Sequence, residues 1–262
     1  MDTPIPESPP APAVSPLAIR WLGHATVLLE VDGVRLLTDP LLRPRAGPLV
    51  RLARPVGPPS VGRVDCVLLS HLHSDHVDLP SLRSLGTSMP IIASQGAGDW
   101  LRRAGLTEVR ELGVGEEAAV RGVTVVATLA QHDEHRRPLG PTAEAIGYLV
   151  RGSQSVYFAG DTDLFPAMGR LRGAVDVALL PVWGWGPDVG PGHLDPERAA
   201  RAAAIIGPQV AIPIHWGTFA VARPARRSED PGWPARRFAA LTEQYAPAVR
   251  VCVLEPGERI EL

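Results

Sequence analysis

The sequence contains no lysine, and all 26 of its basic residues are arginines. Lysine supplies the amine of Schiff-base catalysis and the cation of Walker-type phosphate loops, so both kinds of chemistry are excluded. The net charge is only −2, and acidic and basic residues are interspersed along the chain. No basic stretch is present that could hold a phosphate backbone, and we therefore expect no nucleic-acid partner.

Cysteines and long apolar runs are also scarce. Cys66 and Cys252 are the only cysteines, and both lie in apolar runs, where a free thiol usually behaves as a small buried side chain. A disulfide framework is not indicated. No apolar run approaches the ~20 residues that span a bilayer, and the N-terminus has neither a signal-peptide layout nor an amphipathic pattern. We expect a cytoplasmic protein without a stable membrane anchor.

The composition is that of a soluble globular domain. Of the 262 residues, 45% are hydrophobic and 21% are charged, and the length fits a single α/β core. Residues 1–16 (MDTPIPESPPAPAVSP) are rich in proline, alanine and serine, and such a segment buries too little surface to offset the entropy of ordering it. The sequence therefore predicts a flexible N-terminal tail over 1–16 and one domain over 17–262.

Short β-type runs open this domain and then alternate with helical segments. LAIRWL, TVLLEV and VRLLTD are typical of strands, and Asp32-Gly33 is a hairpin turn signal between the second and the third. The later alternation of strands and helices indicates a layered α/β architecture. The clearest helix has Asp195 as N-cap and Pro196 at its first position, and it stops at Gly207-Pro208. Residues 42–61, dense in Pro, Gly and Arg, predict an irregular surface connection.

All eight histidines fall at the ends of predicted strands or in the loops that follow. The segment Ser70–His76 (SHLHSDH) crowds three imidazoles and a carboxylate behind an apolar strand, and these groups are ligands of zinc and its first-row neighbours. On an extended segment His71 and His73 point the same way and can share one ion, whereas Asp75 and His76 face a second. The alternative is a polar turn that merely happens to be rich in histidine.

A four-coordinate site needs ligands from elsewhere, and His132, Asp161 and His215 each end another apolar run. Their shared position would gather them at one rim of a sheet, where α/β folds usually bind ligands. A hydrogen-bonded structural role is the alternative for each of them.

These motifs resemble those of a known family. His71–His76 resembles the H-x-H-x-D-H signature of the metallo-β-lactamase superfamily, and Gly160-Asp161-Thr162 resembles its bridging-aspartate motif. Four further segments are similar to the N-acylphosphatidylethanolamine phospholipase D branch and its ascorbate-phosphate lactonase-like relatives: WLGHAT, LTDP, HLDPE and IHWGTF. The resemblance covers roughly residues 17–262. It implies an α/β fold, a four-layer αββα sandwich with the metals at one edge.

The resemblance also implies a set of ligands for two divalent metal ions. Zinc is the first choice, with manganese or iron as alternatives. Carried over position by position, the first metal is held by His71, His73 and His132, the second by Asp75, His76 and His215, and Asp161 bridges the two.

Three other residues are of a type that could act around the predicted ligands. Asp39 ends a strand and can accept the second ring N–H of a ligand histidine, or it simply starts the turn before Pro40. His24 fits a place near the metals and a buried structural role about equally well. For His135 a solvated position is expected.

The loop over 183–193 is rich in glycine, and such loops often face the substrate. His193 ends it just ahead of the helix N-terminus, where we expect it to bind substrate or donate a proton. Trp183 and Trp185 are either an apolar wall for the substrate or a local packing anchor.

The expected activity is that of a metal-dependent hydrolase. Two ions ~3.5–4 Å apart can hold a bridging hydroxide at neutral pH and polarise the bond that it attacks. Asp75 can accept the proton of the water, and His193 can protonate the leaving group. A small-molecule phosphodiester is the expected substrate because of the PIHWGTF and GHLDPE segments. A lactonase or other carbonyl-ester hydrolase is the alternative, a non-hydrolytic metal or redox protein is the second, and no feature indicates an oligomeric state.

Overall fold

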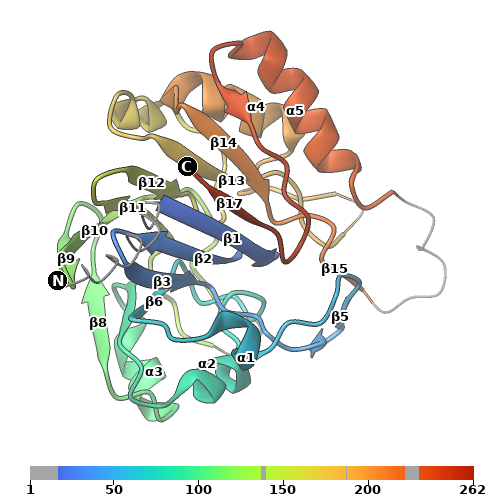
Figure 1. The fold of residues 1–262 in the computed structure, drawn as a ribbon. Coiled ribbons are helices and arrows are strands. Elements are labelled where there is room, and N and C mark those ends of the chain that lie inside the picture. Colours follow the sequence, from blue (N-terminus) through green and yellow to red (C-terminus); the bar gives the residue numbers. More distant parts are fainter. Residues whose placement is uncertain (1–16, 137–139, 187, 222–229) are drawn as a thin grey trace, which may run out of the picture.

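The computed structural model describes residues 17–136, 140–186, 188–221 and 230–262, so the predicted tail over 1–16 lies outside the described residues. Four layers are stacked in this part of the chain (Figure 1). Helices α4 (Pro196–Ile206) and α5 (Trp233–Tyr245) cover one large sheet, and α2 (Leu79–Leu85) and α3 (Gly98–Arg103) cover the other. The predicted αββα sandwich is confirmed.

The first large sheet begins with antiparallel strands and continues with parallel ones. The turn between β2 and β3 is the two-residue hairpin that Asp32-Gly33 predicts, because both residues have the positive φ that such turns need. In spatial order the strands are β17 (Arg259–Glu261), β1 (Leu17–Gly23), β2 (Thr26–Val31), β3 (Val34–Thr38), β6 (Cys66–Leu69), β7 (Ile91–Ser94) and β8 (Val109–Leu112).

The second large sheet has the same number of strands, seven. It runs antiparallel from β9 to β12 and parallel from β12 to β16. In spatial order the strands are β16 (Arg250–Val251), β14 (Val210–Ile214), β13 (Val177–Pro181), β12 (Ser155–Phe158), β11 (Ile146–Arg151), β10 (Val123–Leu129) and β9 (Glu117–Val120).

Helix α4 begins and ends where the sequence predicts. The Asp195 side chain accepts a hydrogen bond from the backbone N–H of Arg198, and Pro196 is the first helical residue. Gly207 ends the helix in the left-handed conformation, with φ of 66°. Two shorter helical segments also occur, α1 (Pro58–Val61) and the 3-10 helix η1 (Pro166–Leu171).

The main core lies between the two large sheets. Alternate residues of β1, Ile19 and Trp21, face this core, whereas Leu22 faces the smaller core under α2 and α3. Both faces of the strand are thus buried, which is why these strands are continuous apolar runs. Tyr148 of β11 joins the sheets, because its hydroxyl donates to the carbonyl of Leu69 at 2.7 Å.

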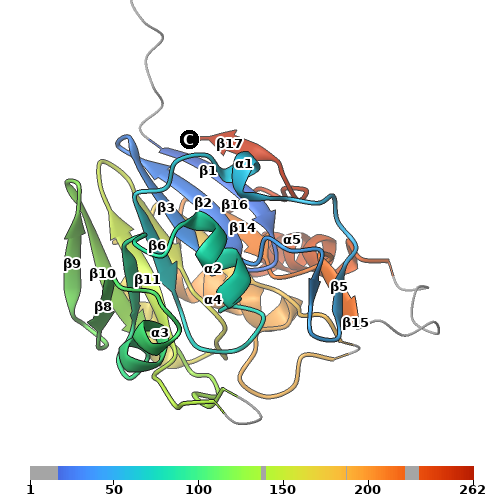
Figure 2. The same cartoon turned by 90° about the horizontal axis from the view of Figure 1, so that it is seen from below.

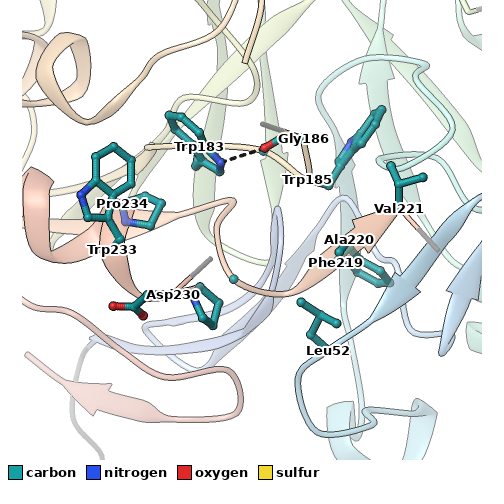
Figure 3. Close-up of a pocket in the computed structure, with 13 residues that line it drawn as sticks. Leu52, Trp183, Trp185, Gly186, Phe219, Ala220, Val221, Asp230, Trp233 and Pro234 are labelled. Atoms are coloured by element: carbon teal, nitrogen blue, oxygen red, sulfur yellow. Dashed lines mark hydrogen bonds between the residues drawn. The ribbon is translucent and has the colours of Figure 1, made fainter. Parts of the chain in front are cut away.

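The prediction of an irregular connection over 42–61 is wrong. This segment contains β4 (Arg45–Ala46), β5 (Leu49–Arg51) and α1, and β5 pairs with β15 (Phe219–Val221) to form a third, small sheet beside the sandwich (Figure 2). The partner strand β15 lies far along the chain, so the pairing could not be predicted from the local sequence, whose Pro and Gly content is typical of loops. The small sheet forms one wall of a pocket lined by tryptophans (Figure 3).

No helix in the described part of the chain combines the length and the apolar character that crossing a bilayer would require.

Candidate metal centre

The predicted ligands all lie in loops at one edge of the two large sheets. Four groups of metal-ligating side chains occur there, and within each group the ligand atoms lie within 4.8 Å of one another. The groups share members, so they form one continuous cluster. By position, His71, His73, Asp75 and His76 lie between β6 and α2, His132 follows β10, Asp161 follows β12, and His215 follows β14.

Tight backbone turns present these side chains. His24, Asp39 and His215 have positive φ angles of 55°, 33° and 65°, a conformation that residues with a Cβ adopt at a cost. Gly160, just before Asp161, has φ of 63°, and a Cβ there would lie 2.8 Å from the carbonyl oxygen of Ile146. The strand therefore needs glycine at this point to bring the following carboxylate into the cluster.

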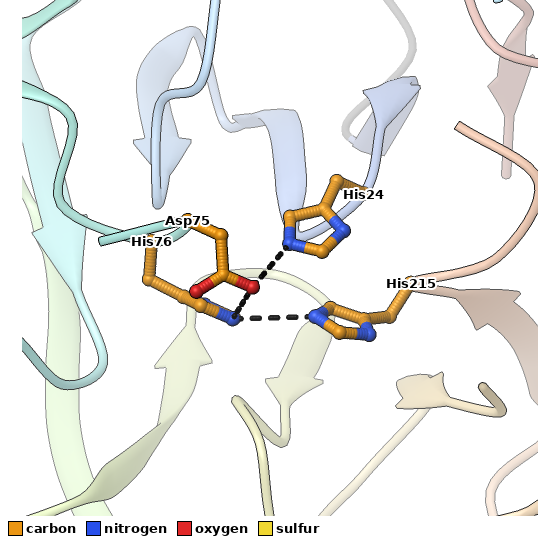
Figure 4. Close-up of side chains that lie close together, drawn as sticks. All are labelled: His24, Asp75, His76 and His215. Carbon is orange, nitrogen blue, oxygen red and sulfur yellow. Dashed lines mark hydrogen bonds and ion pairs between the residues drawn. The ribbon is translucent and has the colours of Figure 1, made fainter. Parts of the chain in front are cut away.

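The second ligand group contains Asp75, His76 and His215, and His24 lies in the same cluster (Figure 4). The Nε2 atoms of His76 and His215 face each other at 3.2 Å. Asp75 Oδ2 is 3.8 Å from His76 Nε2 and 3.1 Å from His24 Nε2. Four potential ligand atoms from three separate loops therefore converge on one point.

Hydrogen bonds fix the tautomers of this group. His215 Nδ1 lies 2.8 Å from the carbonyl oxygen of Trp183, and His76 Nδ1 lies 2.8 Å from Asp39 Oδ2. Both partners can only accept, so both Nδ1 atoms donate and, in the neutral rings, both Nε2 atoms carry lone pairs. Two lone pairs that face each other at 3.2 Å repel unless a cation lies between them. This arrangement fits two histidines that could bind a metal ion through Nε2 while outer hydrogen bonds hold Nδ1.

In the first ligand group, Asp39 acts on His71 through Ser70. The Ser70 hydroxyl is 2.6 Å from Asp39 Oδ2 and 2.9 Å from His71 Nδ1. Because its one proton goes to the carboxylate, the hydroxyl accepts from His71 Nδ1–H, and His71 Nε2 is left with a lone pair. That Nε2 is buried and has no hydrogen-bond partner. Asp39 therefore orients one histidine of each ligand group, where the sequence predicted only one.

The other two members of the first ligand group approach each other in the same way. His132 Nε2 lies 3.0 Å from His73 Nδ1, and His132 Nδ1 donates to the carbonyl oxygen of Gly192 at 2.7 Å. Burial lowers the pKa of His71, His73 and His132, so the rings stay neutral near pH 7 and their lone pairs are available.

Asp161 lies between the two ligand groups. One of its oxygens lies within 4.8 Å of a ring nitrogen of His132, in the first ligand group. In the second group, its Oδ2 is 3.1 Å from His76 Nε2 and its Oδ1 is 3.4 Å from His215 Nε2, and Oδ1 has no hydrogen-bond partner. Burial alone would raise the pKa of Asp161, but the histidines, first His215 and then His76, outweigh it and hold that pKa well below its usual range. A buried, ionised carboxylate favours a cation beside it.

The residues therefore fit divalent metal ions. The donor set is imidazole and carboxylate, the buried His71 Nε2 and Asp161 Oδ1 have no other partner, and the facing imidazole nitrogens need a positive charge between them. Burial lowers the pKa of His215 to about 3, and in His76 the carboxylates of Asp161 and Asp75 outweigh burial and raise the pKa. The cluster thus favours positive charge at its centre.

One buried arginine and one half-buried arginine hold the backbone around the cluster. Arg51 donates to the carbonyl oxygens of Leu22 and Leu41, at 3.1 and 2.8 Å, and burial lowers its pKa to about 10. Arg136 donates to the carbonyl oxygen of Leu72, between two predicted ligands. These bonds fix the loops that carry His24 and His71–His76.

The residues outside the predicted ligand set separate into near and distant ones. His193 Nε2 lies 3.6 Å from Asp161 Oδ2, and its ring is 4.6 Å from that of His132. Its Nδ1 faces the carbonyl oxygen of Pro191, so Nε2 points toward the cluster. The Asp195 side chain already accepts a hydrogen bond from a backbone N–H at the start of α4, so that N–H is not free for an anionic group. His135 instead contacts Thr142 and belongs to none of the four metal-ligating groups in the described residues.

Two contacts could not be read from the sequence. His24 is 2% exposed and bonds Asp75, where the sequence left its role open. The Trp185 indole N–H also donates to Asp75 Oδ2, at 3.0 Å. Asp75 Oδ2 therefore has two hydrogen-bond partners and also faces His76 Nε2.

Comparison with known proteins agrees with this geometry. Residues 34–216 match the model of the Beta-lactamase superfamily domain, which is more than half of the chain. The chain belongs to this superfamily. A UPF0173 metal-dependent hydrolase of Methanopyrus kandleri is 32% identical over 254 residues, which cover 94% of this chain and 100% of the relative. An uncharacterized protein of Mycobacterium tuberculosis is 35% identical over 268 residues, or 94% of this chain and 69% of the relative.

Solved structures with a similar fold are also known. A metallo hydrolase from Ignicoccus hospitalis superposes with a TM-score of 0.70 at 24% identity, over 93% of this chain and 97% of that chain. The protein is thus a metal-dependent hydrolase of the metallo-β-lactamase superfamily. The likeness to the N-acylphosphatidylethanolamine phospholipase D branch stays a prediction.

Proposed function

We propose that the protein hydrolyses a phosphodiester-type bond in a small molecule, with two divalent ions, zinc in the first instance, at the two ligand groups. The observation that carries the proposal is the position of Asp161 between these groups. One of its oxygens lies within 4.8 Å of a ring nitrogen of His132 in the first group, and its Oδ2 lies 3.1 Å from His76 Nε2 in the second. When bound, such ions supply a water of lowered pKa and polarise the bond to be broken.

The chain's own residues divide the remaining tasks. His71, His73 and His132 hold one ion, and Asp75, His76 and His215 hold the other. His193 faces the Asp161 carboxylate from the solvent side, and its side chain is 28% exposed. In its protonated form His193 can donate the Nε2 proton to a leaving oxygen. Asp75 serves first as a ligand, because two hydrogen bonds to Oδ2 make that oxygen a weak proton acceptor.

A comparison of substrates tests this function. One metal-loaded preparation would be assayed on phosphodiesters, lactones and simple carboxylic esters, with kcat/KM as the measure. We expect the phosphodiesters to be hydrolysed with the highest kcat/KM. A higher kcat/KM on lactones would show that the protein is a carbonyl-ester hydrolase with the same metal site, and would contradict the phosphodiester proposal. The absence of hydrolysis of all these substrates would also contradict it.

A further inference from the structure

A pocket of about 620 Å³ lies beside the metal centre, within the range of small-molecule binding sites. We call this cavity the tryptophan pocket. The large apolar side chains that line it are Leu52, Trp183, Trp185, Phe219, Val221 and Trp233 (Figure 3). Leu52 directly follows β5, and the others come from β15, the loop after β13 and the start of α5.

The pocket borders the second ligand group directly. The Trp185 indole N–H donates to Asp75, and the carbonyl oxygen of Trp183 accepts from His215 Nδ1. The ring of Phe219 meets His24 edge-on, with centroids 5.6 Å apart. Three of the lining residues therefore contact this end of the cluster.

His193 lies at the other end. Its nearest ring neighbour is His132 of the first ligand group, at 4.6 Å between centroids. A substrate that reacts at the metal centre would therefore meet an apolar pocket on the side of Asp75 and His215, and a proton donor on the side of His132.

Among the lining residues that the structure describes, the pocket offers mainly carbon surface. Asp230 is the one charged residue among its described lining residues, and it is paired with Arg236. Both indole N–H groups in the 183–186 segment are already used, by the carbonyl oxygen of Gly186 and by Asp75. Leu52, Trp185 and Trp233 nevertheless leave 52%, 41% and 47% of their surface exposed. Uncovered aromatic surface beside a reaction centre is typical of a substrate pocket.

We propose that the tryptophan pocket binds an uncharged alkyl or aryl group of the substrate, carried on the part that keeps the reacting phosphorus atom. This inference rests on the proposed function, because it takes the leaving group to lie at His193. The oxygen of a water molecule bonds to phosphorus and gives up a proton, and the bond from phosphorus to the leaving oxygen breaks. The leaving oxygen takes the proton of His193 Nε2, and the apolar group stays in the tryptophan pocket on the phosphomonoester product.

Two series of substrates test the orientation. In the first, alkyl 4-nitrophenyl phosphodiesters carry methyl to octyl on the retained side, and kcat/KM should rise about fourfold per buried methylene until the pocket is filled. In the second, the same chains are placed on the leaving phenol of methyl phosphodiesters, and kcat/KM should vary little with chain length. An equal rise in both series would overturn the proposal.

Two variants test the pocket itself. Trp233→Ala and Leu52→Ala, from separate elements and both largely exposed, should flatten the rise in the first series. Tyr245→Ala removes an exposed aromatic from the same helix as Trp233 but outside the pocket, and the rise should persist in it. An unchanged rise in both pocket variants would overturn the proposal.

A binding measurement separates this proposal from the proposed function. Alkyl methylphosphonates carry the same chains and are not hydrolysed, and their dissociation constants can be measured through tryptophan fluorescence of the metal-loaded protein. Tighter binding with chain length in the native protein, lost in Trp233→Ala, would support the pocket even if no phosphodiester were cleaved. Hydrolysis of phosphodiesters with no chain-length dependence of either kcat/KM or binding would leave the function in place and overturn the pocket.

Discussion

Replacing Asp161 with asparagine should lower kcat by roughly 10³-fold or more, because the carboxylate lies between both ligand groups and a bound ion supplies several kcal/mol of transition-state stabilisation. Asparagine keeps the shape but loses the charge, and its amide N–H would point at imidazole lone pairs. Asp39→Asn should lower activity by only ~10–100-fold, as is typical when an outer hydrogen-bond partner of a ligand is removed. The order of the two losses is the expected result.

In the structure Asp39 contacts both ligand groups, so the difference expected between the two variants is smaller than if it contacted one group. Asp39 bonds His76 directly and His71 through Ser70, so its loss disturbs both ligand groups, yet every ligand remains. Asp99→Asn, the same change at a side chain 80% exposed on α3, is the control and should retain full activity. Equal losses at Asp161 and Asp39, or a larger one at Asp39, would mean that the bridging carboxylate is assigned to the wrong residue.

His193→Ala should reduce turnover by roughly 10²–10⁴-fold on a phosphodiester with an alkoxide leaving group, since such a group needs a proton. The loss should be much smaller with a nitrophenolate leaving group, which departs without one. Metal content should not change, because the seven predicted ligands account for both ions. Turnover on the two substrates and elemental analysis of the variant are the measurements.

The matched control is His135→Ala, since His135 lies on the same side of the fold but contacts Thr142 instead of the cluster. It should behave as the unaltered protein on both substrates. A metal ion lost from His193→Ala would identify His193 as a ligand, which its place in a group with His132 and Asp161 makes a real alternative. An equal loss on both substrates would remove the proton-donor role and leave charge stabilisation.

Much of the fold follows from local sequence. The caps of α4 at Asp195 and Gly207, the Asp32-Gly33 hairpin and the continuous apolar strands each depend on neighbouring residues, and the structure has all of them. The clustering of His71–His76 with His132, Asp161 and His215 was also predictable. Each of these side chains follows a strand, and strand ends of a layered α/β fold meet at one edge.

The rest depended on contacts between distant segments. The pairing of β5 with β15 and the bond from Trp185 to Asp75 join residues far apart in sequence, and no local pattern signals either. The relay from Asp39 through Ser70 to His71 depends on which atom donates each proton, and hence on distances. A carboxylate at a strand end suggested one outer partner, but only the structure brings that carboxylate to two histidines.

The metal content of the purified protein tests the central claim most directly. The protein would be stripped with a chelator, reloaded separately with zinc, manganese or iron, freed of excess metal and analysed for bound metal per chain. Two ligand groups on either side of Asp161 predict two ions per chain with at least one of these metals. A stoichiometry that stays well below one ion per chain with all three would contradict the account.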